Sequence, residues 1–315
     1  MPISLTQTSL GEGILYYDGT QSQSPNRFKQ AIFGFGWVSG VVKSITNTVT
    51  ITGLVGTDIT GVGTERAYLS ASGYGGDKAI FGYGYNTSIN VSMTNLVSNL
   101  GVVGTDVTGV GTARRMLAAA GYGGDKAIFG YGYTTGAVSM SNLVSNIGIV
   151  ATDVTGVGTA RNEPAAAGYG VDRAIFGYGY TGSTYTALTN LVSNIGVVAT
   201  DVTGVGTGRM GLAAAGYGGD KAIFGYGSTA SVVSLTNLVT NLGVVATDTT
   251  GVGTSRSELA AASYGGDKAI FGYGSYGLTV YASMTNLVSN IGIVATDVTG
   301  VGTGRTGLAA SSFGS

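Results

Sequence analysis

The sequence predicts an all-β fold: a six-bladed β-propeller of four-stranded antiparallel blades, with its ring closed by the C-terminal inner strand. Three observations predict it: a short motif recurs six times, each repeat holds four short β-like runs, and the ends of the repeat region complement each other. The motif is Ala-Ile-Phe-Gly-Tyr-Gly (Phe replaces Tyr in the first copy), and its phenylalanines are Phe33, Phe81, Phe129, Phe176, Phe224 and Phe271. They lie 48, 48, 47, 48 and 47 residues apart, a period typical of propellers and related repeat arrays.

The composition supports one large repeat domain and limits its partners. The chain has 315 residues, with 57 Gly but only 3 Pro, so it is neither collagen-like nor a proline-rich linker. Hydrophobic residues make up 43% and can supply a core, whereas charged residues make up 10% and leave a net charge of -1. Nucleic acids and anionic membranes attract clustered Lys and Arg, so neither is an expected partner. A nearly neutral surface favours association, so a homo-oligomer is compatible with the sequence.

The sequence lacks two residue types on which much protein chemistry depends. The chain contains no Cys and no His, so disulfides, thiolate chemistry and the commonest metal ligands are absent. We therefore expect no metal and no cofactor. The N-terminal residues MPISLTQTSLGEG carry neither a basic region nor an apolar run, so they do not resemble a signal peptide. No run approaches about 18 apolar residues, so no membrane insertion is expected.

Residues 1–30 do not match the repeat, and we expect them to form an N-terminal arm or linker ahead of a propeller domain at 31–315. Residues 14–20 read as a short strand with an Asp-Gly turn, and residues 21–27 read as a polar linker. Two interpretations remain open: a loosely docked tail, or an anchoring arm that contacts a neighbouring protein or subunit.

Each unit contains four runs, shown here for the unit around Phe129. The small-residue run is Leu-Ala-Ala-Ala-Gly-Tyr (117–122), and Gly-Gly-Asp-Lys leads from it into the phenylalanine run (127–132). Turn residues between two β-like runs predict a hairpin. The aliphatic run (142–150) and the Thr-Asp run (152–161) complete the unit. The smallest side chains suit the crowded innermost strand, and the aliphatic run, which is apolar on both faces, suits the middle of a blade packed between its neighbours.

The ends of the repeat region predict closure. The first phenylalanine run, at Ala31, has no small-residue run of the repeat type before it, and the last small-residue run (308–313) has no phenylalanine run after it. Pairing of these two runs would complete a sixth blade and leave no unpaired edge in the ring. The alternative is a β-solenoid of six stacked coils, which needs special capping units and gives no reason for complementary ends.

The repeat resembles a Kelch unit. Its Arg-x-x-Leu-Ala-Ala-Ala-Gly-Tyr-Gly-Gly-Asp-Lys-Ala-Ile-Phe-Gly-Tyr-Gly places an Arg before a small inner strand, then a tight turn, then an apolar strand ending in glycines, as Kelch units do. The resemblance covers 31–315. It departs from the family in two ways. The Gly-Gly doublet becomes Gly130-Tyr131-Gly132, and the Trp that the family has on its outer strand is missing, with Thr155-Gly156 near its position. The near-identical units look most like Kelch-like repeats of bacteriophages and other viruses, which implies a virion-surface or host-recognition role.

The most variable part of each unit lies between the phenylalanine run and the Asn that opens the aliphatic run; we call these six stretches the variable loops. The phenylalanine-to-Asn distance varies between 13 and 15 residues, whereas the distance from each Asn to the next phenylalanine is always 34. Variation confined to loops on a constant scaffold is typical of binding sites. Aromatic residues among small polar ones could bind a protein or stack on a sugar, although a Tyr at a strand end can also simply pack beneath its loop. The candidate ligand-binding residues are Trp37, Tyr85, Tyr133, Tyr180, Tyr185, Tyr276 and Tyr281. In an up-and-down blade, the loops that precede the small-residue runs lie on the same face.

Two charged residues recur once per unit, and their regularity predicts a structural role. The aspartates are Asp58, Asp106, Asp153, Asp201, Asp248 and Asp297. The arginines are Arg66, Arg114, Arg161, Arg209, Arg256 and Arg305. We expect Asp to cap a turn through backbone N–H groups and Arg to tie adjacent blades or carbonyls together. The alternative is a sixfold ion or anion site.

Catalysis has little support, so we expect a protein without enzymatic activity. Glu65, Glu163 and Glu258 fall near the loops before the small-residue runs of separate units, where a carboxylate pair across the axis would suit a glycosidase. The function we expect is a phage or viral structural protein on the virion surface that binds a host-surface glycan or another virion protein. The alternatives are a cellular Kelch-type adaptor for a protein partner and, less favoured, a glycoside-cleaving enzyme.

Overall fold

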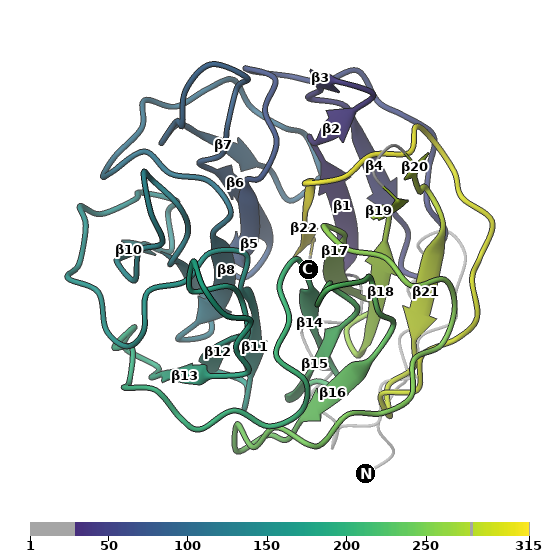
Figure 1. Cartoon of the computed structure of the whole chain (residues 1–315). Coiled ribbons are helices and arrows are strands. Elements are labelled where there is room, and N and C mark those ends of the chain that lie inside the picture. The colour runs from purple at the N-terminus through teal and green to yellow at the C-terminus, as the bar shows by residue number, and fades with distance from the viewer. Residues whose placement is uncertain (1–28, 278–279, 315) are drawn as a thin grey trace, which may run out of the picture.

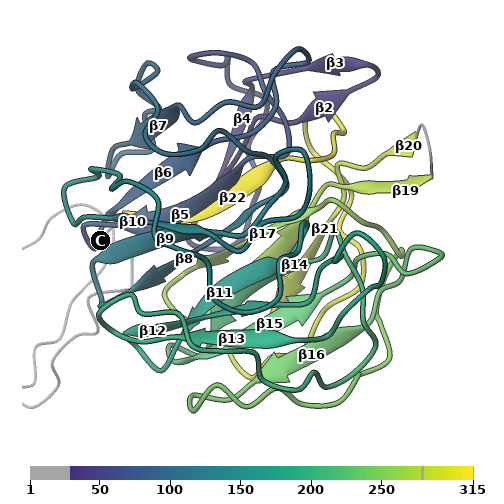
Figure 2. The same ribbon diagram turned by 60° about the vertical axis from the view of Figure 1, so that its left-hand side comes forward.

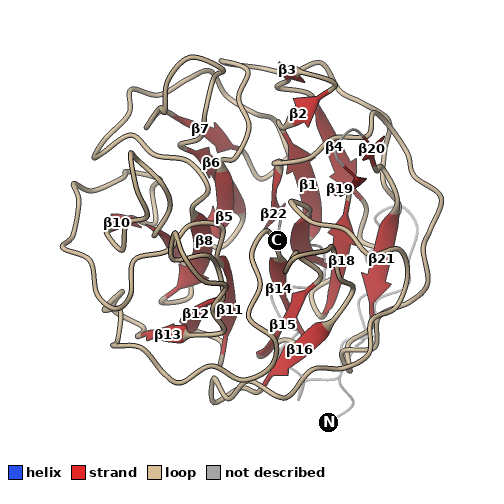
Figure 3. Ribbon diagram, viewed as in Figure 1, coloured by secondary structure: helices blue, strands red, loops and turns tan. Residues whose placement is uncertain are grey.

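Six antiparallel sheets follow one another along the chain and surround a common centre in the computed structural model (Figures 1 and 3). The structure describes residues 29–277 and 280–314. Within these residues there is no helix, so none of them forms a helix that could cross a membrane. The expected all-β class is therefore confirmed. The expected N-terminal arm lies outside the described residues, except for Lys29 and Gln30.

Each sheet has three strands in the order of small-residue run, phenylalanine run and aliphatic run. The inner strands are β22 (Ala309–Phe313), β5 (Ser70–Tyr74), β8 (Ala118–Tyr122), β11 (Ala165–Tyr169), β14 (Ala213–Tyr217) and β17 (Ala260–Tyr264). The middle strands are β1 (Gln30–Gly34), β6 (Lys78–Gly82), β9 (Lys126–Gly130), β12 (Arg173–Gly177), β15 (Lys221–Gly225) and β18 (Lys268–Gly272). The third strands are β4 (Thr46–Val49), β7 (Thr94–Val97), β10 (Ser141–Val144), β13 (Thr189–Val192), β16 (Thr236–Val239) and β21 (Thr285–Val288).

Two additional hairpins extend the variable loops of the first and last units. They are β2 (Trp37–Val38) with β3 (Val41–Val42), and β19 (Ser275–Gly277) with β20 (Val280–Tyr281). Figure 2 shows both hairpins projecting from the same end of the sheets.

The two ends of the repeat region pair with each other, as the complementary runs predicted. Strand β22 pairs antiparallel with β1, from Gln30 opposite Phe313 to Gly34 opposite Ala309. Each inner strand also contacts the inner strand of the next sheet, and β22 contacts both β5 and β17. The first and last units therefore share one sheet.

Backbone hydrogen bonds link the six units in a closed cycle. One residue shortly before each inner strand donates its backbone N–H to the carbonyl of the equivalent residue in the preceding unit. The cycle closes where Tyr68, the first of these residues, donates to the carbonyl of Gly307, the last, at 2.6 Å. The six residues are Tyr68, Met116, Glu163, Gly211, Glu258 and Gly307. All six have positive φ angles. Because each link repeats the same geometry, the left-handed conformation is imposed even on Tyr, Met and Glu, which rarely adopt it.

The core lies in the spaces between adjacent sheets, and the phenylalanine run supplies most of it. Ile128 and Phe129 of β9 are both fully buried, but on opposite faces of the sheet: Phe129 packs in the cluster with Ile80, and Ile128 in the cluster with Phe176. A strand buried on both faces is continuously apolar rather than alternating. The same arrangement places Phe33 against Ile270, between the last sheet and the first.

The expected fourth strand is wrong, because the end of the aliphatic run and the Thr-Asp run return along the third strand through isolated bridges only. In the second unit, Val103 bridges Val97 and Val107 bridges Thr94. Four residue steps separate the two bridges on one side but only three on the other, so one extra residue bulges out and interrupts the ladder. The sheets are therefore three-stranded.

The aliphatic run was expected to lie in the middle of a blade packed between its neighbours, and only its first half is packed in this way. Strand β7 ends at Val97, and the chain then turns through Gly101 at a φ of 77°. The turn leaves Leu100 81% exposed. The run therefore combines a buried strand with an exposed turn.

Candidate functional site

The variable loops and the segments that precede the inner strands meet at one end of the sheets, which we call the loop face. Isolated bridges join the two sets of segments in every unit. The pairs are Trp37 with Thr306, Ala67 with Tyr85, Arg115 with Tyr133, Asn162 with Tyr180, Met210 with Ser228, and Ser257 with Ser275. The Gly-Gly-Asp-Lys turns occupy the opposite end. The expectation that both loop sets share one face agrees with this pairing.

The aromatic residues predicted to bind ligand all lie on the loop face, but they do not form one continuous surface. Tyr180 and Tyr185 pack together with ring centroids 5.3 Å apart. Tyr185 and Tyr276 are the most accessible, at 39% and 41% exposure. The others are half-buried; they are Trp37, Tyr85, Tyr133, Tyr180 and Tyr281. Only some of these rings lie together, and the others are spread around the loop face.

Arg115 lies beside two of these rings. Its guanidinium carbon is 4.7 Å from the ring centroid of Tyr85 and 5.3 Å from that of Tyr133, within range of cation–π attraction. The two tyrosines come from neighbouring sheets, so the Arg115 side chain bridges the gap between them. The equivalent positions in the other units hold Ala67, Asn162, Met210, Ser257 and Thr306.

Unpartnered buried polar atoms gather on the loop face. Among the described residues, four buried side-chain atoms lack a hydrogen-bond partner, and three of them are Asn90 Oδ1, Arg115 Nε and Asn162 Oδ1. The fourth belongs to the repeated Arg161. A buried polar atom without a partner costs about 1–3 kcal/mol. This cost is concentrated where the repeats differ from one another, which is typical of functional rather than structural positions.

The centre of the loop face holds two acidic side chains. Glu163 and Glu258 line a small cavity of about 70 Å³ together with Tyr68. Burial, with a contribution from the charge of Glu258, raises the pKa of Glu163 to about 8. Burial also raises the pKa of Glu258, although hydrogen bonds from Thr306 and Tyr68 oppose the shift. A carboxyl group with a pKa near 8 is largely protonated at neutral pH and can donate a proton.

The third acid considered in the sequence lies elsewhere. Glu65 forms an exposed ion pair with Lys43 at 3.7 Å and is not part of the central cavity. No group of three or more acidic side chains lies close enough to hold a metal ion within residues 29–277 and 280–314.

The repeated Asp and Arg residues join a third residue, Asn, in one network per unit. In the second unit, Arg66 Nη2 donates to Asn95 Oδ1 at 2.6 Å, and Asn95 Nδ2 donates to Asp106 Oδ1 at 2.9 Å. Asp106 also accepts hydrogen bonds from the backbone N–H and the hydroxyl of Thr64. The guanidinium of Arg66 is fully buried and lies 4.3 Å from the ring centroid of Phe35 in the preceding sheet. The network therefore fixes each unit to its neighbour.

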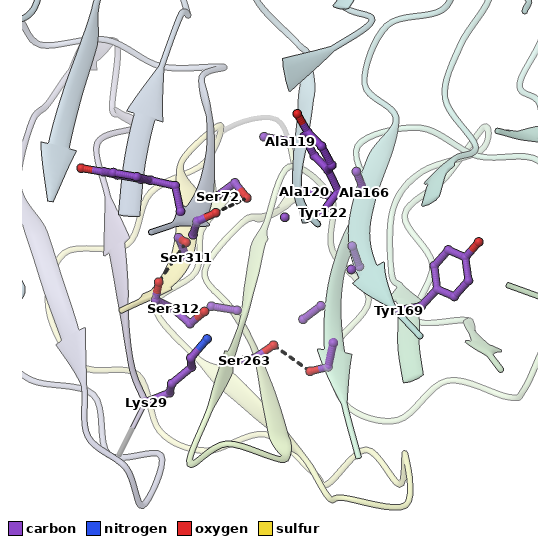
Figure 4. A pocket seen from close by; sticks show the side chains of 18 of the residues that line it. Lys29, Ser72, Ala119, Ala120, Tyr122, Ala166, Tyr169, Ser263, Ser311 and Ser312 are labelled. Atoms are coloured by element: carbon purple, nitrogen blue, oxygen red, sulfur yellow. Dashed lines mark hydrogen bonds between the residues drawn. The ribbon is translucent and has the colours of Figure 1, made fainter. Parts of the chain in front are cut away.

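Five further repeated aspartates shape the turns at the end of the sheets opposite the loop face. Asp77, Asp125, Asp220 and Asp267 each pair with the following Lys at 2.6–2.8 Å. The fifth, Asp172, lies 4.0 Å from Arg173. A cavity of about 240 Å³ lies here between the inner strands, and Figure 4 shows Lys29 directed into it near Ser311 and Ser312. Burial lowers the pKa of Lys29, although the charge of Asp77 opposes this.

Comparison with known proteins finds no match to any protein-family model and no match to any curated protein.

Two features of the loop face were missed in the sequence. Asn95 and its equivalents were noted only as the start of the aliphatic run, although one polar residue at a buried strand position in every unit was a usable signal. Arg115 was also overlooked. It was visible as the second Arg of Arg114-Arg115, a doublet that occurs in one unit only.

Proposed function

We propose that the six sheets form a six-bladed, Kelch-like β-propeller that acts as a recognition module without catalytic activity. Two observations support the propeller: the pairing of β22 with β1, and the closed cycle of hydrogen bonds through Tyr68 and Gly307. A solenoid of stacked coils would leave its first and last units apart. Recognition is favoured because the units are nearly identical in their strands and differ mainly in the variable loops.

The ligand we propose is a glycan bound on the loop face. The observation that carries this proposal is the combination, on that face, of accessible Tyr185 and Tyr276 with the unpartnered polar atoms of Asn90 and Asn162. A sugar ring offers an apolar face to a tyrosine and hydroxyls that both donate and accept hydrogen bonds. Both acceptor atoms are buried, so we expect them to gain partners through a bridging water or a small shift of the side chain when the ligand binds.

The setting we propose is the surface of a phage or virus particle, where the propeller would bind a host-surface glycan. This part of the proposal rests on the resemblance of the near-identical units to viral Kelch-like repeats. Another virion protein is the alternative partner for the same face.

A glycan array probed with the intact chain tests the proposal. We expect binding to a limited set of glycans, with at least a tenfold loss of affinity in Tyr180→Ala or Tyr185→Ala. The control is Val171→Ala, because Val171 is 80% exposed in the turn at the opposite end of the sheets. The glycan proposal is abandoned if no glycan binds, or if the tyrosine variants bind as well as the control does.

One observation favours a second function, the cleavage of glycosides. Glu163 and Glu258 share one cavity, and the raised pKa of Glu163 suits a general acid. Incubation with a panel of polysaccharides, analysed for new reducing ends, tests this candidate. Products that disappear in Glu163→Gln would support cleavage, and unchanged polysaccharides would eliminate it.

A further inference from the structure

We propose that Arg115 binds the anionic group of the ligand, so that the loop face recognises an acidic saccharide bearing a carboxylate or a sulfate. The inference rests on the proposed glycan function and specifies the chemical class of the glycan.

The argument begins with the contrast between Arg115 and the repeated arginines. Arg114, its neighbour in the chain, is fully buried but donates to Tyr131 O, Thr112 O and Asn142 Oδ1 and lies 3.9 Å from Asp153. Its charge and its donors are therefore satisfied within the fold. By contrast, no side-chain hydrogen bond or ion pair of Arg115 occurs within the described part of the chain, and its Nε is buried without a partner. A guanidinium has five N–H donors, so most of its binding capacity is unused.

The surroundings of Arg115 hold it in place without neutralising it. The rings of Tyr85 and Tyr133 contact the guanidinium, and the backbone of Arg115 pairs with Tyr133. Tyr85 itself is fixed by a hydrogen bond from its hydroxyl to Thr87 O at 2.7 Å. Contacts with aromatic rings use the faces of a guanidinium and leave its in-plane donors for a ligand. Two such donors match the two oxygens of a carboxylate or a sulfate.

The acidic residues of the loop face do not compete for this position. Oε2 of Glu163 lies close to Gly211, since a Cβ added to that glycine would be 3.1 Å from it. Gly211 belongs to the next unit along the chain, so this carboxyl group points away from the unit of Arg115. Glu258 hydrogen-bonds to Thr306 at 3.0 Å, and Glu65 pairs with Lys43. The positive charge of Arg115 therefore remains available to a ligand.

The neighbouring groups favour a saccharide over a simple anion. Tyr85 and Tyr133 add flat apolar surface beside the charge, and Asn90 donates to the carbonyls of Tyr133 and Thr134, both at 3.3 Å, while its own Oδ1 has no partner. A ligand that combines a ring with one anionic group would use the tyrosines and the charge together, and a hydroxyl of the ligand would reach Asn90 Oδ1 through a bridging water.

The test measures binding of three related probes: 3′-sialyllactose with a carboxylate, 6′-sulfolactose with a sulfate, and neutral lactose. We expect at least one acidic probe to bind at least tenfold more tightly than lactose. Arg115→Met should remove this preference, so that the acidic probes bind no more tightly than lactose does. Methionine can still contact the two tyrosines, and Met210 already occupies the equivalent position in another unit, so the variant should keep the fold, which its melting temperature will verify. Arg115→Lys should retain part of the preference, since it keeps the charge but loses the planar fork.

The matched control is Arg173→Gln, which removes one positive charge from an exposed turn at the opposite end. It should bind all three probes as the parent chain does. If acidic and neutral probes bind equally and Arg115→Met changes nothing, the Arg115 inference is wrong while glycan binding stands. If neither these probes nor any glycan on the array binds, both proposals fail. A preference that is lost equally in Arg173→Gln would show an effect of net charge and would also overturn the inference.

Discussion

Arg305 and Asn47 lie 258 positions apart in the sequence and are joined by a hydrogen bond of 2.7 Å between Nη2 and Oδ1. Arg305 also donates to Phe35 O at 2.8 Å and lies 3.9 Å from Asp58. The bonds that fix neighbouring units elsewhere thus connect the last unit to the first. Long-range closure depends on side chains as well as on the pairing of β22 with β1.

Arg305→Met should therefore destabilise the whole chain. The substitution leaves the buried Asn47 Oδ1 and Phe35 O without their donor, which costs about 1–3 kcal/mol for each acceptor, and it removes the cation beside Asp58. Urea unfolding will measure the free energy of unfolding. Arg173→Met, at an exposed position, is the control and should change it by less than about 0.5 kcal/mol. Equal unfolding midpoints for the two variants would contradict a role for Arg305 in closure.

Gly130→Ala should also destabilise the fold, for a steric reason. A Cβ at Gly130 would lie 2.6 Å from Cζ of Phe176 in the next sheet, so one of two packed strands must move. Overpacking of this kind costs about 1–3 kcal/mol. The control is Gly136→Ala, because a Cβ there has no neighbour within 4 Å and no positive φ is involved. We expect a lower melting temperature only for Gly130→Ala; an unchanged value would mean that the sheets pack less tightly than the structure indicates.

Stability should fall in acid because of the repeated aspartates. Partial burial acts to raise the pKa of Asp106, but hydrogen bonds from Thr64 and Asn95 and the charge of Arg66 outweigh it and hold the pKa below the usual 3.8. A carboxylate with a lowered folded-state pKa stabilises the protein above pH 3.8, and this contribution is lost as the pH falls through the folded-state value. The other five aspartates show the same direction.

Melting curves between pH 7 and pH 2 will check this expectation. Asp106→Asn should melt below the parent chain at pH 7, and the difference should shrink as the pH falls below 3.8. Asp172→Asn, in an exposed turn, should follow the parent throughout. A difference for Asp106→Asn that stays constant down to pH 2 would show that charge is not what Asp106 contributes.

Glu163→Gln should have the opposite pH dependence. Burial raises the pKa of Glu163 from 4.5 to about 8, so folding favours its protonated form. The stability linked to that proton is complete below pH 4.5 and is lost as the pH rises through 8. Glutamine needs no proton to remain neutral. The variant should therefore match the parent at pH 4 and melt at a higher temperature at pH 9; a lower melting temperature at pH 9 would show that the carboxylate is favourably paired.

Much of the fold could be predicted from the sequence because it depends on local patterns. The Phe129 repeat, the Ala-rich inner strand and the Gly-Gly-Asp-Lys turn each carry a short-range signal, and complementary ends predicted the pairing of β22 with β1. The prediction of a fourth strand was wrong because one extra residue between Val103 and Val107 forms a bulge that interrupts the ladder. A shift of one residue in strand pairing leaves no mark in the amino-acid pattern. The exposed Leu100 was missed because an aliphatic run does not reveal where it turns.

The candidate site was only partly predictable. The variable loops and the segments before the inner strands were predicted to share one end of the sheets, and the bridges between them agree with this. The contact of Arg115 with two tyrosines depends on Tyr85, which belongs to the preceding sheet, and the shared cavity of Glu163 and Glu258 joins units that are 95 residues apart. Such pairs are set by the arrangement of whole sheets, so no local pattern marks them.

The hydrogen-bond cycle through Tyr68 and Gly307 has a consequence for how such a gene can change. In an open array, recombination can add or delete a repeat at little cost to the remaining ones. Here every repeat donates one hydrogen bond of the cycle and accepts another, so the loss or gain of one copy breaks two hydrogen bonds and changes the angle between all neighbouring sheets. The number of repeats is therefore tied to the geometry of this cycle, whereas the variable loops supply none of its hydrogen bonds and can change in sequence and length without breaking it.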